Sequence, residues 1–368
     1  MVPTVLNELN TSDLDWIVKT GKSVDIAEGT ILTQSNRSSD VIFFILDGLF
    51  LLGADAQTTF SSQSSQLSSA IASSFIPLIQ LTCGEIVGIL SSLDSESSSS
   101  VIYSQSASTI FAIPRSVLAQ KLQEDFAFAA RWYRTAGRLL FHRTQCLKQQ
   151  LANQGAPVAR SHQRQAITLF AELEDSDLDW LATVGQVQTL AGNTVLVPCG
   201  RSPSALHIVL DGALGMSQPN GAEQLAQSHI LLHAFSRVHL AAPANEVRLS
   251  RGDLIGDMGL IHAYEPVTQV WAVRESQVLS VPGWRLAAKL LHDVGFASRF
   301  YRVLAMLLAT DYQAILHTVY TRHLAEQVNR AGVEPSAFGP ISNESKLLTR
   351  LSLAEARFEW LLQRIQAQ

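Results

Sequence analysis

The chain has 368 residues, of which 47 % are hydrophobic and only 16 % are charged, and its net charge is −5. This length and this apolar fraction predict two or three domains, each with a core of its own. The slightly negative charge argues against a general nucleic-acid-binding protein, because such proteins usually carry basic patches.

The first residues, 1–16, contain neither the basic segment nor the apolar core of a signal peptide. The most apolar run, 41–54, is interrupted by Asp47 and is shorter than the roughly 20 residues that a membrane span needs. The three cysteines are far apart and show no zinc or disulfide spacing. We therefore expect a cytoplasmic protein without a membrane span.

The sequence is duplicated. SDLDW occurs at 12–16 and again at 176–180, and LDG occurs at 46–48 and again at 210–212, both with an offset of 164. A second block, 107–145, recurs 168 residues later at 275–313. This period is too long for a solenoid, so it indicates two whole domains.

Each half shows the same order of predicted elements. A short helix that contains LDW comes first, several β-rich runs follow, and a helix ends the half. The β-rich runs are 23–34, 40–52 and 99–114 in the first half and 186–198, 205–217 and 267–282 in the second. We expect a first domain at 1–152, a linker at 153–170, a second domain at 171–330 and a C-terminal amphipathic helix within 331–368.

With these elements in place, the chain resembles the cyclic-nucleotide-binding domain of the catabolite-activator, protein-kinase-A-regulatory and cation-channel superfamily. The resemblance is carried by residues 28–48, by GDLIGDMGL at 252–260 and by VLSVP at 278–282. It implies a mainly β fold with flanking helices: two tandem β-roll, or jelly-roll, domains followed by C-terminal helices.

The family's phosphate-binding cassette contains F-G-E, whose glutamate takes the ribose hydroxyl, and later an arginine that pairs with the phosphate. In the second half Ile255, Gly256 and Asp257 match F-G-E, but the arginine position falls on Pro266. In the first half the F-G-E positions are 87–89, and the arginine position is Ser98. The resemblance thus implies that both cassettes are degenerate. The candidate ligand-binding residues in the second half are Ile255, Gly256, Asp257, Met258, Gly259, Val267 and Thr268.

The C-terminal segment predicts an amphipathic helix after the SNES cap at 342–345. Its apolar residues, at alternating spacings of four and three, are Leu347, Leu351, Ala354, Phe358, Leu361 and Ile365. The seam must bury against something, because isolated helices of this length are marginal in water. It packs either on the protein's own body or on a partner or second copy.

Other features have simple interpretations. The histidines at 229, 233 and 239 could form a metal site but lack acidic or cysteine partners, and the serine-rich runs 61–75 and 91–100 are typical of surface loops. The basic, aromatic run 132–143 indicates a helix with a cationic polar face. No catalytic motif is present, and no DNA-reading module follows the long helix.

These observations favour a non-enzymatic scaffold or interaction protein. It would act as a component or regulator of a larger assembly, through a protein partner or self-association, without nucleic acid and without a cofactor. The alternative is a regulatory sensor that binds a cyclic nucleotide or a related ligand in the second domain. A transcription factor is disfavoured by the missing DNA-reading module.

Overall fold

The computed structural model describes residues 8–33, 40–55, 75–93, 100–153, 165–199, 203–217, 246–256, 269–331 and 344–366. The chain divides into two compact units, one of residues 1–148 and 308–339 and the other of residues 149–307 and 340–368. The long helix α9 (Val294–Ala331) contributes to both units. The serine-rich runs and the three histidines lie largely or wholly outside the described residues.

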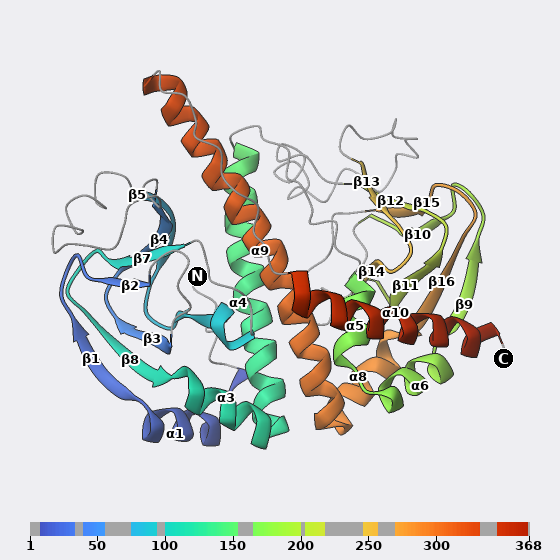
Figure 1. The fold of residues 1–368 in the computed structure, drawn as a ribbon, viewed down its shortest axis with the longest axis horizontal. Helices are drawn as coiled ribbons and strands as arrows, with labels where there is room; N and C mark the ends of the chain where they lie inside the picture. Colours follow the sequence, from blue (N-terminus) through green and yellow to red (C-terminus); the bar gives the residue numbers. More distant parts are fainter. Residues whose placement is uncertain are drawn as a thin grey trace, which may run out of the picture. The chain divides into compact units, whose positions relative to one another are not determined.

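The first unit contains two four-stranded antiparallel sheets (Figure 1). The strands of one sheet, in spatial order, are β1 (Lys22–Ile26), β8 (Ser108–Pro114), β3 (Val41–Asp47) and β6 (Ile86–Val87). Those of the other are β2 (Ile31–Thr33), β7 (Val101–Ser104), β4 (Phe50–Asp55) and β5 (Phe75–Leu81).

The second unit repeats this topology with each strand number raised by eight. One sheet has the order β9 (Gln186–Leu190), β16 (Ser276–Pro282), β11 (Ala205–Asp211) and β14 (Leu254–Ile255). The other has the order β10 (Val195–Val197), β15 (Val270–Ala272), β12 (Leu214–Ser217) and β13 (Glu246–Leu249). Pairing of the first strand with the eighth and of the second with the seventh is the path of a jelly roll. The two expected β-roll domains are therefore confirmed.

Helices flank both β-rolls. The helices that begin in the first unit are α1 (Thr11–Thr20), the 3₁₀ helix η2 (Ile89–Leu93), α3 (Arg115–Glu124) and α4 (Phe126–Asn153). The helices that begin in the second unit are α5 (Gln165–Glu172), α6 (Asp175–Val184), α8 (Gly283–His292), α9 and α10 (Glu344–Gln366). Within the described ranges, none of these helices combines the length and the apolar character of a membrane span.

The repeated LDG marks a turn that only glycine fits. Gly48 and Gly212 have φ angles of +104° and +100°, a region that side chains with a Cβ rarely adopt. A Cβ on Gly48 would lie 2.8 Å from the Cα of Ser108, and one on Gly212 would lie 2.5 Å from the Cα of Ser276. The turn between the third and fourth strands of each unit therefore packs directly against the start of the eighth strand.

Candidate functional site

The cassette region of the second unit is described up to Gly256. Gly256 has a φ angle of +94°, and a Cβ there would lie 2.6 Å from the carbonyl oxygen of Ala205. Ile255 is only 6 % exposed and belongs to the hydrophobic core of the unit. Of the predicted ligand-binding residues, Ile255 thus serves the core and Gly256 forms a sharp turn. The others, Asp257, Met258, Gly259, Val267 and Thr268, lie outside the described residues.

The residues just before this turn are also engaged. The backbone N–H of Gly252 donates to the carbonyl of Val209 at 2.9 Å, which attaches the segment to β11. The carboxylate of Asp253 accepts a bond from the backbone N–H of Ser250 at 2.6 Å. Asp253 therefore stabilises its own turn.

Two basic side chains of the second unit lie on or beside β11. His207 on β11 pairs in register with Ile255, and its Nδ1 lies 2.8 Å from the hydroxyl oxygen of Ser280. Burial lowers the pKa of His207 to about 4, so its ring is neutral near pH 7. Arg274 donates to the carbonyl of Gly212 at 3.4 Å, five residues along β11 from His207, or about 17 Å in an extended strand. His207 is thus neutral near pH 7, and the guanidinium of Arg274 is engaged with the turn at Gly212.

The equivalent region of the first unit is built around a buried ion pair. Glu85 is 6 % exposed, and Arg143 on α4 is 3 % exposed. Arg143 Nη2 donates to the Glu85 carboxylate at 2.7 Å and to the carbonyl of Ile86 at 2.8 Å. Burial also raises the pKa of Tyr312 on α9, in the same unit, to about 12. Sequence reasoning missed this pair, because Arg143 is the last residue of a run that indicated an exposed cationic face.

The segment after Gly88 continues as η2, which is packed into the first unit. Ile89, which the resemblance aligns with the family's ribose-binding glutamate, is 1 % exposed, and Leu93 is equally buried. The indole Nε1 of Trp132 on α4 donates to the hydroxyl of Ser92 at 3.2 Å. The side chains of Ile89 and Leu93 therefore belong to the core of the first unit.

Three arginines of α4 pair with acidic residues of the same unit. Arg131 donates to both carboxylate oxygens of Asp13, at 2.6 and 2.8 Å. Arg134 and Arg138 both pair with Glu8. These ion pairs tie α4 to acidic residues near the start of the same unit.

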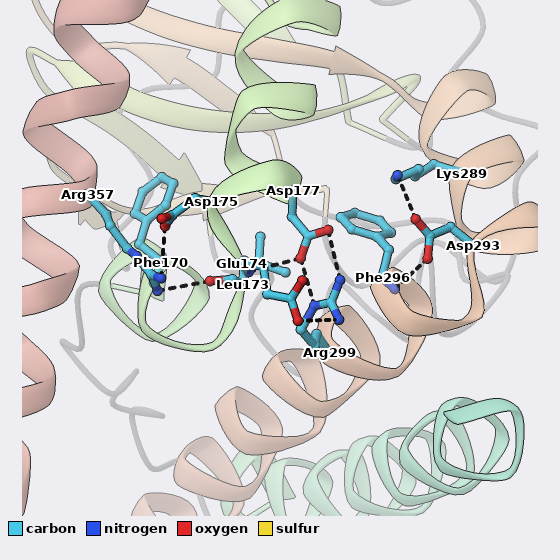
Figure 2. Close-up of polar contacts among 10 residues, drawn as sticks. All are labelled: Phe170, Leu173, Glu174, Asp175, Asp177, Lys289, Asp293, Phe296, Arg299 and Arg357. Atoms are coloured by element: carbon cyan, nitrogen blue, oxygen red, sulfur yellow. Dashed lines mark hydrogen bonds and ion pairs between the residues drawn. The ribbon is translucent and has the colours of Figure 1, made fainter. Parts of the chain in front are cut away.

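The pair between Asp13 and Arg131 recurs in the second unit, which explains why these two residues are identical in the two halves. Arg299 on α9 donates to both carboxylate oxygens of Asp177 on α6, at 2.7 and 3.0 Å (Figure 2). Lys289 lies 2.7 Å from Asp293, whose carboxylate also accepts the backbone N–H of Phe296. The aspartate–arginine pairs hold α1 against α4 in the first unit and α6 against α9 in the second. The repeated SDLDW is therefore a structural element.

Helix α10 packs on α5 and α6 of the second unit. Arg357 donates to the carbonyls of Phe170 and Leu173, both at 2.9 Å, and pairs with Asp175 (Figure 2). Phe358 is 8 % exposed, and its ring lies 5.3 Å from that of Phe170.

The predicted seam of α10 is thus covered by the chain itself over part of its length. Leu361 is fully buried, as is Ala354, and Ile365 is half-buried. The side chains of Leu347 and Leu351 are outside the described part. The described contacts of this seam therefore agree with the first alternative, packing on the protein's own body.

Arg251, next to the cassette turn, is also held by α10. Its guanidinium pairs with Glu359 and lies 5.0 Å from the ring of Phe358. A basic side chain is therefore present one residue before Gly252, but it is engaged with the C-terminal helix. Among the described residues, no group of three or more His, Cys, Asp and Glu side chains is placed to hold a metal ion.

No family model matches the chain, and no curated protein sequence matches it. The regulatory domain of Toxoplasma gondii PKA with cAMP is 13 % identical over 79 % of this chain and 89 % of its own, with a TM-score of 0.28. A cAMP-independent protein kinase A regulatory subunit from Trypanosoma brucei has the same identity and coverage and a TM-score of 0.25. The catabolite activator protein of Thermus thermophilus is 14 % identical over 51 % of this chain and 75 % of its own, with a TM-score of 0.31. At such low identities and TM-scores these similarities carry no argument about ligands, and the fold stands on the strand order of the two units.

Proposed function

We propose that this protein is a non-enzymatic interaction protein of the cytoplasm, in which two cyclic-nucleotide-binding-like β-rolls form a scaffold or regulatory component of a larger assembly. One observation supports the proposal: in the first unit the segment that resembles the family's cassette is packed into the core. Ile89 is buried at the position of the family's ribose-binding carboxylate, and Glu85 is paired with Arg143.

The chemistry of the ligand supports this proposal. A cyclic phosphodiester keeps a negative charge, and burying that charge without a cation is costly. In the first unit Arg143 is the basic group beside the cassette, and Glu85 already neutralises it. A nucleotide would have to displace this pair and the packed helix η2.

In the second unit the cation is also missing from the expected place. Position 266 is a proline. His207 is neutral near pH 7, and Arg251 is engaged with Glu359. The competing hypothesis, a cyclic-nucleotide sensor in this unit, depends on Asp257 and its neighbours, which lie outside the described residues.

The test is isothermal titration of the full-length protein with cyclic AMP and cyclic GMP, with light scattering on the same sample. We expect no binding heat with either nucleotide. Pro266→Arg places an arginine at the family's cassette position. A gain of binding in this variant would show that the absence of a cation at position 266 prevents the second unit from binding a nucleotide. Micromolar binding by the native protein, abolished by Asp257→Ala, would replace the scaffold proposal with the sensor.

A further inference from the structure

Helix α8 presents large apolar side chains to solvent. Trp284 is 70 % exposed and Leu291 is 75 % exposed. Ala288, also exposed, lies between them at spacings of four and three, so the three side chains share one face of the helix. Isolated apolar residues on a surface are ordinary, but an aromatic and a leucine in one stripe mark a surface that another molecule can cover.

The equivalent helix of the first unit shows that the β-roll does not require this stripe. Helix α3 has the same length as α8 and follows the equivalent strand. The residues 168 positions before Trp284, Ala288 and Leu291 are Ser116, Gln120 and Gln123, all exposed and polar. The stripe is therefore a property of the second unit alone, added to a helix that folds without it.

The stripe has a basic border. The guanidinium of Arg285 lies 5.1 Å from the centre of the Trp284 ring, and His292 ends the helix. Within the described ranges no carboxylate pairs with Arg285. The first unit has Val117 and Glu124 at the two equivalent positions. Both the apolar and the basic character of this face thus distinguish the second unit, in a chain whose net charge is −5.

The size of the stripe limits what can cover it. A fully buried aromatic side chain removes about 150–250 Å² of surface from water. Burying a leucine stabilises by about 1.5–3 kcal/mol, which at about 25 cal/mol per Å² corresponds to roughly 60–120 Å². With the exposed fractions above, the two side chains offer on the order of 200 Å². A stable dimer needs about 800 Å² from each partner, so this face is too small to hold a second copy by itself. It suits a short segment.

We infer that the exposed face of α8, formed by Trp284, Ala288 and Leu291 with Arg285 at its edge, is the docking surface for an acidic amphipathic segment of a protein partner. Apolar side chains of that segment would cover the stripe, and its carboxylates would pair with Arg285. The inference rests on the proposed function, for which it supplies a partner surface.

The first unit provides the residues for the test. The variant Trp284→Ser/Leu291→Gln carries the side chains of α3 at the same positions, so it should keep the melting temperature of the native protein. Binding is measured by fluorescence anisotropy with a labelled peptide of about 18 residues, or five helical turns. The peptide has leucine at every third or fourth position and glutamate elsewhere, and a control peptide has lysine in place of glutamate.

We expect saturable binding of the acidic peptide to the full-length native protein. The double variant should weaken it at least tenfold, and Arg285→Val and the lysine peptide should each weaken it at least threefold. Equal affinity for the native protein and the double variant, or no saturation by the native protein, would overturn the inference.

A native dimer that the double variant converts to a monomer, seen by light scattering, would also overturn the inference, because the face would then bind a second copy. The nucleotide titration is scored separately. Cyclic-nucleotide heat from the native protein counts against the scaffold proposal, whereas a failure of the peptide experiment alone counts only against this docking surface.

Discussion

Substituting Arg143 tests the buried ion pair of the first unit. Arg143→Met removes the cation and leaves the Glu85 carboxylate buried without its partner, because both side chains are less than a tenth exposed. Breaking a buried pair from one side costs about 3–5 kcal/mol. We expect the first unit to lose stability by this amount.

The double variant Glu85→Leu/Arg143→Met should recover most of that loss, because no charge then remains buried. Arg143 Nε has no hydrogen-bond partner among the described residues, so replacing both partners also removes an unsatisfied donor. Asp253→Asn is the matched control. Asp253 lies 168 residues after Glu85 and accepts its bond in an exposed turn, so this change should cost about 1 kcal/mol or less.

The assay is urea unfolding combined with hydrogen exchange of peptides that cover β3 and β6, because exchange reports each unit by itself. Arg143→Met should speed exchange in the first unit and leave β11 and β16 unchanged. A cost below about 1 kcal/mol, or a double variant as unstable as the sum of the single ones, would refute the assignment of a buried, coupled pair.

Three further predictions concern other parts of the chain. The folded-state pKa of His207, about 4, is below the unfolded value near 6.5. The stability that the neutral, buried ring contributes is therefore present above pH 6.5 and is lost as the pH falls toward 4, a loss of about 3 kcal/mol in urea titrations. This loss should disappear in His207→Phe, and an unchanged pH slope would show that another group titrates. Arg357→Ala removes two hydrogen bonds to backbone carbonyls and should make α10 more sensitive to limited proteolysis. Arg364→Ala breaks only an exposed ion pair and should not have this effect. Equal cleavage of the two variants would contradict this account. Gly48→Ala should lower stability in thermal unfolding by about 1–3 kcal/mol more than Gly29→Ala. Both positions have a positive φ angle, but only a Cβ at position 48 would meet other atoms. Similar losses for the two variants would mean that backbone strain alone matters.

Much of the fold could be predicted because the sequence is duplicated. The recurrence of SDLDW and of LDG placed two equivalent domains on the chain before any contact was known. The β-rich runs gave most of the strands, since alternation and turn residues are local signals. The division at α9 could not be predicted, because one continuous helical pattern does not show which unit each part of the helix packs against.

The candidate site was less predictable. Spacing placed Ile255 and Gly256 in a cassette, but it could not show that the side chain of Ile255 belongs to the core. The run 132–143 predicted a helix with a cationic polar face, and only the fold brought Glu85 to Arg143 and, just before the run, Asp13 to Arg131. The recurrence of both Asp13 and Arg131 in the second half was the one signal in the sequence that could have suggested their pairing.

The sequence by itself determined that the chain contains two β-rolls with helices, because strand periodicity, turn glycines and internal repetition are carried by neighbouring residues. Tertiary structure alone decided which charges cancel. Arg131 pairs with a carboxylate 118 residues away, and Arg357 binds carbonyls more than 180 residues away. Such partners are set by how the elements pack, and the free energy of burying a charge depends on that packing rather than on the charge itself.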